Sequence, residues 1–259
     1  MYEMISIILH GACGHMGKVV SGMAAQDPDV RIVAGVDAYG VQYADFPVYR
    51  KISDCTVEAD VIIDFSTAEA VDELIAYGVE RGIPMVVCTT GLSESQIRAI
   101  SDASTEVAIL RSGNMSLGIN LIMKLLRDAS KVLCANGYDP EIIEEHHRRK
   151  LDAPSGTAIM LADSIREGSG TDYTYTYGRA DRRSPRDGRE IGISSVRGGT
   201  ITGVHDVLFA GEDEVIEIKH TAYSRAIFAK GAVAAAKFLA QKKPGLYDMS
   251  DVIGEGTAS

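Results

Sequence analysis

The chain opens on an apolar run followed by a turn rich in glycine, Met4-Ile5-Ser6-Ile7-Ile8-Leu9-His10-Gly11-Ala12-Cys13-Gly14-His15-Met16-Gly17. The continuous apolar run over 4–9 is typical of a strand that is buried on both faces of a sheet. A helical pattern over 16–26 follows the glycines. Glycine at such a turn lets the backbone bring amide N–H groups close to a pyrophosphate, and the helix dipole adds favourable potential. The stretch therefore predicts a dinucleotide-binding turn, with an ordinary tight strand–helix turn as the alternative.

The second predicted strand, 31–36, ends at an acid that bears on cofactor choice. Asp37 lies 20 residues after Gly17. In this arrangement an acid accepts hydrogen bonds from the adenosine ribose hydroxyls, and it repels the 2′-phosphate of NADPH. Ala38, the next residue, supplies no compensating cation. We therefore expect NADH as the preferred cofactor and NADPH as a second one, although the distant Arg50-Lys51 pair leaves a 2′-phosphate contact open.

Strands and helices alternate through the first half of the chain. Further strands are predicted at 60–65, 84–88 and 107–110, with helices at 68–81 and 93–103. This order is typical of an α/β fold with a Rossmann-type parallel sheet and helices on both faces. Because such sheets bind ligands at the carboxyl ends of their strands, two further loops should line the same crevice: Cys88, Thr89 and Thr90, and Ser112, Gly113, Asn114 and Met115.

The pattern changes near residue 116. Helices are predicted at 117–134, 157–167 and 225–241, and strands at 142–145, 173–177, 191–197, 200–208 and 215–220. We expect a smaller α+β domain with a mixed or antiparallel sheet, in which the Arg-, Asp- and Gly-rich segment 178–189 forms a mobile loop. The dinucleotide-binding domain should comprise 1–116 and 225–259, and the second domain 117–224. Closure of the two domains over their ligands is expected.

Composition excludes several classes of protein. A net charge of −10 argues against a general nucleic-acid binder or an anionic-membrane binder, because both need a basic surface. The four cysteines form no C-x-x-C pair, so neither a metal site nor a redox motif is expected. No segment approaches the ~20 consecutive apolar residues of a transmembrane helix. Without a signal-peptide pattern, a cytoplasmic protein with reduced thiols is expected.

A second motif concentrates cations inside this acidic chain: Glu144-Glu145-His146-His147-Arg148-Arg149-Lys150-Leu151-Asp152-Ala153-Pro154-Ser155-Gly156-Thr157-Ala158. Its last residues open a predicted helix, whose N–H groups and hydroxyls suit a carboxylate. The motif therefore predicts a site for a small dianion, with an imidazole or an ammonium as acid. A solvated loop is the competing interpretation. A metal site is less favoured, because adjacent histidines cannot easily share one metal.

This motif closely resembles the signature E-x-x-H-H-x-x-K-x-D-x-P-S-G-T-A of the 4-hydroxy-tetrahydrodipicolinate (dihydrodipicolinate) reductases of the diaminopimelate–lysine pathway. The acids are shifted, since Glu145 directly precedes His146 and Glu144 lies two before it. The resemblance extends over nearly the whole chain. Further matching stretches are Gly11–Gly17, Thr89–Gly91, Asn114–Asn120, Val196–Gly199, Gly203–His205 and Ser224–Ala232.

The resemblance implies roles for individual residues. His146 would donate and accept the catalytic proton, and Lys150 would donate a proton to the substrate. His147 would contact one substrate carboxylate, and Gly156 and Thr157 would hold the other. It also implies NAD(P)H-dependent reduction and a homotetramer whose mixed sheet forms the subunit interface. The residues implied to line the cofactor are Gly11, Ala12, Cys13, Gly14, His15, Met16, Asp37, Cys88, Thr89, Thr90, Ser112, Gly113, Asn114 and Met115.

Departures from the family pattern concern the cofactor pocket. Family members often have Arg at the positions of His15 and Ala38, so an NADPH preference is in doubt; they also often have Gly at Cys88 and Phe at Met115.

Two alternatives stay open. Another Rossmann oxidoreductase acting on an aspartate-derived substrate should lack the HH…K…PSGT string. A non-enzymatic NADH-binding regulator should lack the catalytic His and Lys.

Overall fold

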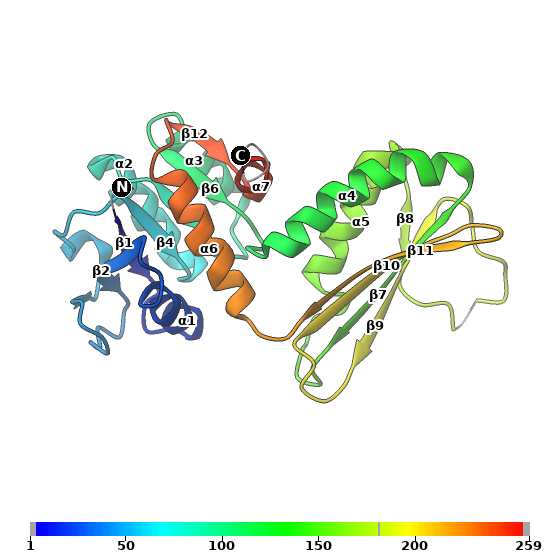
Figure 1. Ribbon diagram of the computed structural model, residues 1–259, viewed down its shortest axis with the longest axis horizontal. Coiled ribbons are helices and arrows are strands. Elements are labelled where there is room, and N and C mark those ends of the chain that lie inside the picture. The colour runs from blue at the N-terminus through cyan, green and yellow to red at the C-terminus, as the bar shows by residue number, and fades with distance from the viewer. Residues whose placement is uncertain (1–3, 181, 256–259) are drawn as a thin grey trace. The chain divides into compact units, whose positions relative to one another are not determined.

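The computed structural model describes residues 4–180 and 182–255 (Figure 1). The chain divides into two compact units, Met1–Leu117 with Ala226–Ser259, and Gly118–Arg225. No helix among the described residues is long and apolar enough to cross a membrane. In chain order the elements are β1 (Ile5–His10), α1 (His15–Ala24), β2 (Val30–Val36), β3 (Val48–Tyr49), η1 (Ile52–Asp54), β4 (Val61–Asp64), η2 (Ala68–Ala70), α2 (Val71–Arg81), β5 (Met85–Val87), α3 (Glu94–Ala103), β6 (Ala108–Arg111), α4 (Leu117–Leu133), η3 (Cys134–Asn136), β7 (Asp139–His146), α5 (Gly156–Ser169), β8 (Thr174–Thr176), β9 (Glu190–Arg197), β10 (Gly203–Ala210), β11 (Val215–Ala222), α6 (Ala226–Leu239), β12 (Gly245–Tyr247) and α7 (Met249–Glu255).

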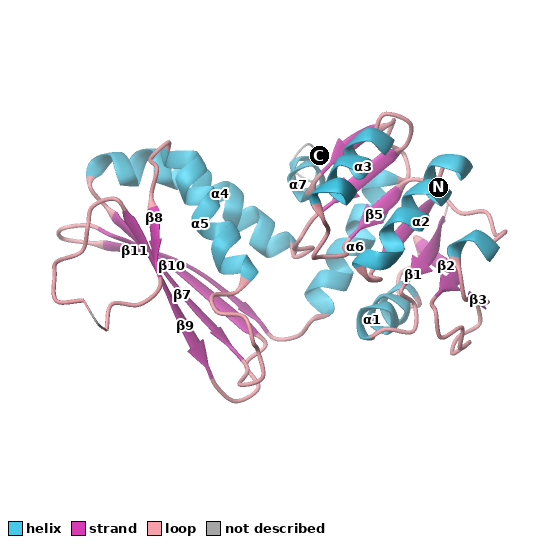
Figure 2. Ribbon diagram, turned by 180° about the vertical axis from the view of Figure 1, so that it is seen from behind, coloured by secondary structure: helices cyan, strands magenta, loops and turns pink. Residues whose placement is uncertain are grey.

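The first unit is built on a seven-stranded sheet in the order β12-β6-β5-β4-β1-β2-β3, in which every pair is parallel. Helices α1 and α6 cover one face, and α2 and α3 cover the other (Figures 1 and 2). The strand order reverses between β1 and β4, which is where open parallel sheets bind ligands. The predicted Rossmann-type parallel sheet is confirmed.

Strand β1 explains why this sheet needs helices on both faces. Ile7 and Leu9 pack into the core under α1 and α6, whereas Ile8 packs into the core under α2 and α3. All three side chains are fully buried. Since successive side chains of a strand point to opposite faces, a continuous apolar run supplies both cores.

The second unit is a five-stranded sheet in the order β11-β10-β7-β9-β8, covered on one face by α4 and α5 (Figures 1 and 2). Strand β10 is antiparallel to β11 and β7, and β7 and β8 are both parallel to β9. Leu126 of α4 and Leu161 of α5 pack on Ile142, Ile191 and Phe209 of the sheet. The predicted α+β unit with a mixed sheet is confirmed.

Element boundaries differ from the sequence prediction where packing decides them. Strand β7 is longer than the predicted 142–145, and β10 begins three residues after the predicted 200. The helix predicted at 68–81 begins as a 3-10 turn, and Thr67 makes no side-chain cap bond there with the described residues. Strands β3 and β12 and helix α7 were not predicted. The two strands have only two and three residues, too few for a periodic pattern.

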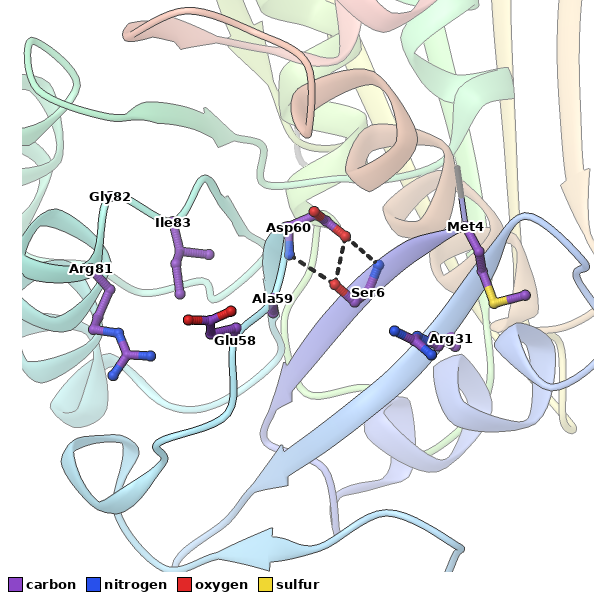
Figure 3. Close-up of a pocket in the computed structure, with 9 residues that line it drawn as sticks. All are labelled: Met4, Ser6, Arg31, Glu58, Ala59, Asp60, Arg81, Gly82 and Ile83. Carbon is purple, nitrogen blue, oxygen red and sulfur yellow. Dashed lines mark hydrogen bonds between the residues drawn. The ribbon is translucent and has the colours of Figure 1, made fainter. Parts of the chain in front are cut away.

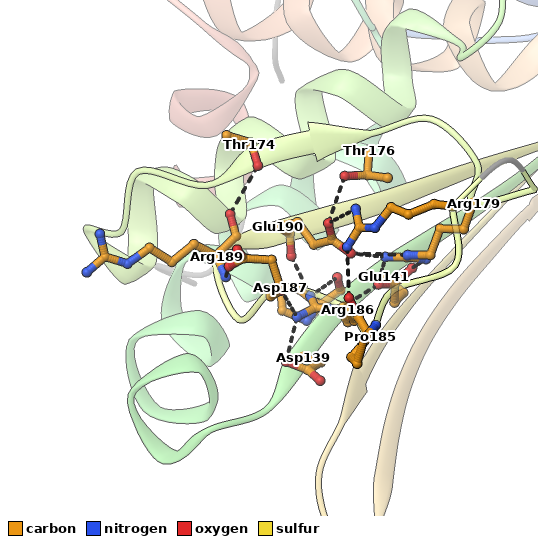
Figure 4. A network of polar contacts seen from close by, with 12 residues as sticks. Asp139, Glu141, Thr174, Thr176, Arg179, Pro185, Arg186, Asp187, Arg189 and Glu190 are labelled. Carbon is orange, nitrogen blue, oxygen red and sulfur yellow. Dashed lines mark hydrogen bonds and ion pairs between the residues drawn. The ribbon is translucent and has the colours of Figure 1, made fainter.

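The described residues of the segment predicted as a mobile loop, 178–180 and 182–189, are anchored to the outer face of the second sheet, and residue 181 lies outside the described residues (Figure 4). Arg179 Nη2 lies 2.6 Å from Glu141 Oε1, and Arg182 Nη1 lies 2.7 Å from Glu190 Oε2. Arg186 also contacts Glu141, through its Nε at 2.9 Å. The arginines that suggested a mobile loop therefore bind carboxylates at one end of β7 and β9.

Candidate active site

The glycine-rich turn brings backbone amides to the carboxyl end of β1. Gly11 has a φ of +78°, and a Cβ at Gly11 would overlap the carbonyl of Phe65. A Cβ at Gly17 would overlap the carbonyl oxygens of Gly11 and Ala12, so α1 can approach the turn this closely only with glycine. Helix α1 begins after Gly14 with neither a side-chain cap bond to a described residue nor an acid in its first turn. Its amino terminus therefore fits the pyrophosphate of a dinucleotide.

Asp37 connects this turn to the end of β2. Its Oδ2 accepts a hydrogen bond of 2.9 Å from the Cys13 N–H, and its Oδ1 accepts one of 3.1 Å from the Tyr39 N–H. A carboxylate oxygen has two lone pairs. Each oxygen of Asp37 therefore keeps acceptor capacity for a ribose hydroxyl while the carboxylate holds the turn in place.

A cavity of about 570 Å³ lies over the turn and brings together four of the predicted cofactor residues. Two exposed cations, Arg50 and Lys51, also line it. The sequence left open whether these cations reach a 2′-phosphate, and the structure places them on the same cavity as Asp37. The four predicted residues are Gly11, Cys13, Gly14 and Asp37.

Other predicted cofactor residues lie outside the lining of that cavity. Ala12 is fully buried, and its Cβ faces Gly35 of β2, so only its backbone is available to a ligand. His15 and Met16 form the first turn of α1. Met115 is 2% exposed and packs in the core under α1 and α6.

The loops after β5 and β6 are held by internal hydrogen bonds. Thr89 Oγ1 donates to Asp64 Oδ2 at 2.7 Å, while the neighbouring Cys88 is buried and Thr90 is exposed. Ser112 Oγ donates to the Asn114 carbonyl at 2.9 Å, across Gly113. These bonds give both loops a defined shape at the carboxyl ends of the strands.

A second hollow, of about 680 Å³, opens at the opposite edge of the same sheet (Figure 3). Arg31, Arg81 and Glu58 line it, and Asp60 Oδ2 accepts a 2.7 Å hydrogen bond from the Ser6 N–H. It contains none of the predicted site residues. Parallel sheets bind their ligands at the carboxyl ends of the strands, so this hollow lies away from the candidate cofactor site.

In the second unit, the predicted proton-transferring groups lie around the end of β7. His146 is the last residue of β7, and its Nδ1 lies 2.6 Å from Glu144 Oε2. Lys150 follows in a turn that is closed by a 3.0 Å hydrogen bond from the Lys150 N–H to the His147 carbonyl. Lys150 Nζ lies 2.7 Å from Asp152 Oδ2, and this hydrogen bond lowers the pKa of Asp152.

Helix α5 begins beside this turn, at the predicted carboxylate-binding residues. Ser155 caps it, because its Oγ accepts a 3.1 Å hydrogen bond from the Ala158 N–H. Gly156 and Thr157 are the first two helical residues, and a Cβ at Gly156 would meet no described atom within 4 Å. Amides at a helix start, with open space in front of them, suit a carboxylate.

Glu144 is a fully buried carboxylate with several donors. Arg197 binds it with both terminal nitrogens, at 2.8 and 2.6 Å, and the Ser155 N–H donates to Oε1 at 3.2 Å. Burial by itself would raise the pKa of Glu144. Hydrogen bonds from Arg197, Ser195 and His146 outweigh that effect and lower the pKa to about 2. The carboxylate is therefore ionised at neutral pH.

Two imidazoles meet at this site. The His146 and His205 rings pack edge to face, with centroids 5.2 Å apart, and His205 Nε2 lies 2.9 Å from Ser155 Oγ. Burial, reinforced by the charge of His146, lowers the pKa of His205 to about 3. Burial also lowers the pKa of His146, against the opposing effect of Glu144 and with a further contribution from Lys150.

Comparison with known proteins places residues 5–115 and 118–253 in one family. The family model described as "Dihydrodipicolinate reductase, N-terminus" matches residues 5–115, and the model described as "Dihydrodipicolinate reductase, C-terminus" matches residues 118–253. The chain belongs to the dihydrodipicolinate reductase family. The resemblance seen in the sequence is therefore confirmed.

Two relatives support this family, and one solved structure shares the fold. A 4-hydroxy-tetrahydrodipicolinate reductase of Caldanaerobacter subterraneus subsp. tengcongensis is 50% identical over 98% of this chain and 100% of its own length. One from Clostridium novyi is 45% identical over 96% of this chain and 98% of its own. The structure of a dipicolinate-bound dihydrodipicolinate reductase from Paenisporosarcina sp. TG-14 has a TM-score of 0.80 at 24% identity, covering 95% of this chain and 97% of that one.

For this member of the dihydrodipicolinate reductase family, sequence reasoning missed four contributors to the site. Arg197 and His205 lie on matching stretches of the family pattern, but the motif gives no partner for either. The period of a strand puts Glu144 on the same face as His146, which was the one signal in the sequence for their contact. The four are Glu144, Ser155, Arg197 and His205.

Proposed function

We propose that this chain is a 4-hydroxy-tetrahydrodipicolinate reductase, which uses NAD(P)H to form tetrahydrodipicolinate in diaminopimelate and lysine biosynthesis. The observation that carries the proposal is the grouping of His146 and Lys150 near the amino terminus of α5. A proton donor beside a carboxylate-binding helix start suits a small dicarboxylate whose reduction consumes a proton. The names of the 50% and 45% identical relatives support the same reaction.

The residues divide the reaction between binding and proton transfer. A bound nicotinamide dinucleotide supplies the hydride. The substrate has a 4-hydroxyl that the product lacks, so water leaves while a hydride and a proton are added. Lys150 donates a proton to the substrate, and His146 exchanges a proton near it. His147 contacts one carboxylate, while Gly156 and Thr157 hold the other.

The two units take separate tasks in this proposal. The unit 1–117 with 226–259 binds the dinucleotide, and 118–225 binds the substrate and forms the subunit interface of a homotetramer. The outer sheet face of the second unit exposes Ile143, Val196 and Val215, at 36%, 46% and 55%, which supports a contact between copies. None of the four cysteines is in a disulfide, which suits the cytoplasm.

NADH is the preferred cofactor and NADPH the second. Asp37 on the cavity wall accepts ribose hydroxyls and repels a 2′-phosphate, and Ala38 offers no cation to offset it. Arg50 and Lys51 line the same cavity and supply positive charge, so NADPH is still accepted.

A coupled assay tests the reaction and the cofactor preference together. Aspartate semialdehyde, pyruvate and the preceding synthase generate the substrate in place, and oxidation of NADH and NADPH is followed in parallel. Fast, synthase-dependent oxidation with NADH favoured is expected. Faster oxidation of NADPH would overturn the cofactor preference alone, and binding of cofactor without turnover would favour a regulator.

Substitution of the two proton-transferring groups tests the site. His146→Gln and Lys150→Ala should each lower kcat about 10²-fold or more, which is typical for a lost acid or electrostatic donor. NADH affinity should stay unchanged, because the dinucleotide is held by the other unit. Near-wild-type kcat in both variants contradicts the assignment.

A further inference from the structure

One buried carboxylate connects all three parts of the proposed substrate site. Glu144 contacts His146 Nδ1, the Ser155 N–H at the start of α5, and the Arg197 guanidinium. Arg197 Nη2 also donates to the Asp152 carbonyl at 2.7 Å, within the turn whose Lys150–Asp152 ion pair was described above. The pair therefore contacts the imidazole, the start of the carboxylate-binding helix and the turn that contains Lys150.

We propose that Glu144 and Arg197 are positioning residues of the reductase, which orient His146 and align it with the carboxylate-binding start of α5. This role presupposes the function proposed above. Neither side chain need touch the substrate or the cofactor. Their effect on the reaction passes through His146, Ser155 and the 150–152 turn.

Strand register explains how these groups meet. Glu144 of β7 pairs with Ser195 of β9 and with His205 of β10, and His146 pairs with Arg197. Side chains two residues apart on a strand share a face, so Glu144, His146 and Arg197 all point to the side covered by α5. The bidentate Arg–carboxylate bond fixes the orientation of the carboxylate as well as its charge.

Glu144 selects one tautomer of His146. An ionised carboxylate 2.6 Å from Nδ1 can only accept a hydrogen bond, so Nδ1 carries the proton. That leaves Nε2 as the atom that exchanges a proton with the substrate. Gly203, which has no side chain, lies beside Nε2, and a Cβ there would be 3.1 Å from it. A glycine at this position keeps access to Nε2 open.

Burial lowers the pKa of His146, and four groups lie around its ring. The negative charge is Glu144, and the positive charges are Arg197 and Lys150. The fourth group, His205, packs against the ring and has a strongly lowered pKa because it is buried. Of these groups, only Glu144 raises the pKa of His146. Its neutralisation should therefore move the His146-linked inflection of the pH–rate profile to lower pH.

The first test compares Glu144→Gln with Glu212→Gln, the same change at an exposed position in the turn between β10 and β11. Glu144→Gln should lower kcat about 10²-fold, shift the inflection to lower pH and leave NADH affinity unchanged. Glu212→Gln should match wild type in all three. A purely structural role for Glu144 would lower the melting temperature and the yield of active enzyme without moving the inflection, and that outcome overturns the proposal.

A second test needs no turnover. Nitrogen-15 NMR of histidine-labelled wild type, with His146→Asn for assignment, should show protonated Nδ1 and unprotonated Nε2 above the pKa of His146. The opposite tautomer overturns the proposal even if the enzyme is fully active. Conversely, absence of substrate-dependent NADH oxidation in wild type overturns the proposed function without changing the NMR result.

A third variant keeps the test decisive if Glu144→Gln does not fold. Arg197→Lys keeps the positive charge but cannot make the two parallel bonds to the carboxylate. It should lower kcat at least 10-fold and raise KM for the dicarboxylate substrate, because the start of α5 loses its alignment. Wild-type kcat, KM and pH profile in Arg197→Lys overturn the proposal.

Discussion

At the residue scale, two glycines of α1 differ in the space around them. A Cβ at Gly17 would overlap backbone oxygens of the glycine-rich turn, whereas a Cβ at Gly22 would meet no described atom within 4 Å. Gly17→Ala should therefore unfold the turn locally and abolish NADH binding, since backbone atoms cannot move aside cheaply. Gly22→Ala should keep NADH binding and raise stability by up to about 1 kcal/mol, the helix-propensity difference. NADH titration and urea denaturation measure both, and normal NADH binding by Gly17→Ala contradicts the account of the turn.

Arg50 is expected to affect a different property, the KM for NADPH. Arg50 lines the same cavity as Asp37, and its positive charge attracts a phosphate there. Arg50→Gln should therefore raise KM for NADPH about 10-fold and leave KM for NADH unchanged. Arg31→Gln, an exposed cation at the opposite edge of the sheet, is the matched control and should change neither. Steady-state kinetics with both cofactors measure the effect. Equal changes with NADH and NADPH would show that Arg50 does not contact the 2′-phosphate.

At the element scale, Glu190 attaches the arginine-rich loop to the start of β9. A hydrogen bond from Arg182, joined by bonds from Arg179 and Thr176 and opposed by burial, lowers the pKa of Glu190 to about 2, from an ordinary 4.5. A carboxylate with a lowered folded-state pKa stabilises the fold above its unfolded-state pKa, and loses that contribution as pH falls. Glu190→Gln should therefore be less stable than wild type at pH 7, and the difference should shrink between about pH 4.5 and 2.

Thermal denaturation across that pH range measures the effect of Glu190. Glu212→Gln, at an exposed position in the turn between β10 and β11, is the control and should follow wild type. A constant stability difference between Glu190→Gln and wild type at every pH would mean that packing, and not charge, holds the loop.

At the scale of the whole molecule, the proposed cofactor site and substrate site belong to different units. Because hydride transfer requires the two ligands in contact, closure of the two units over them is expected. The chain crosses between the units at 117–118 and 225–226. Solution scattering with NADH and dipicolinate together should show a smaller radius of gyration than with either ligand alone. An unchanged radius contradicts closure.

Local pattern was enough to predict most elements, and it failed where partners far along the chain decide the outcome. The run 4–9 and the glycines after it predicted β1, the turn and α1. The residues that decide burial on two faces and a tight turn are neighbours in the chain. Strands β3 and β12 form because they pair with β2 and β6, respectively. The loop at 178–189 was predicted from composition as mobile, yet its arginines find carboxylates on β7 and β9.

The sequence by itself determined the alternation that builds the parallel sheet, the glycine turn with Asp37 after the second strand, and the string that contains His146, Lys150 and Gly156. These depend on side-chain period, backbone freedom and charge, which act between near neighbours. Only the tertiary structure decided that Arg197 meets Glu144, that His205 packs on His146, and that Arg50 shares a cavity with Asp37. Those contacts follow from strand register and from packing between elements distant in the chain, and no local pattern specifies either.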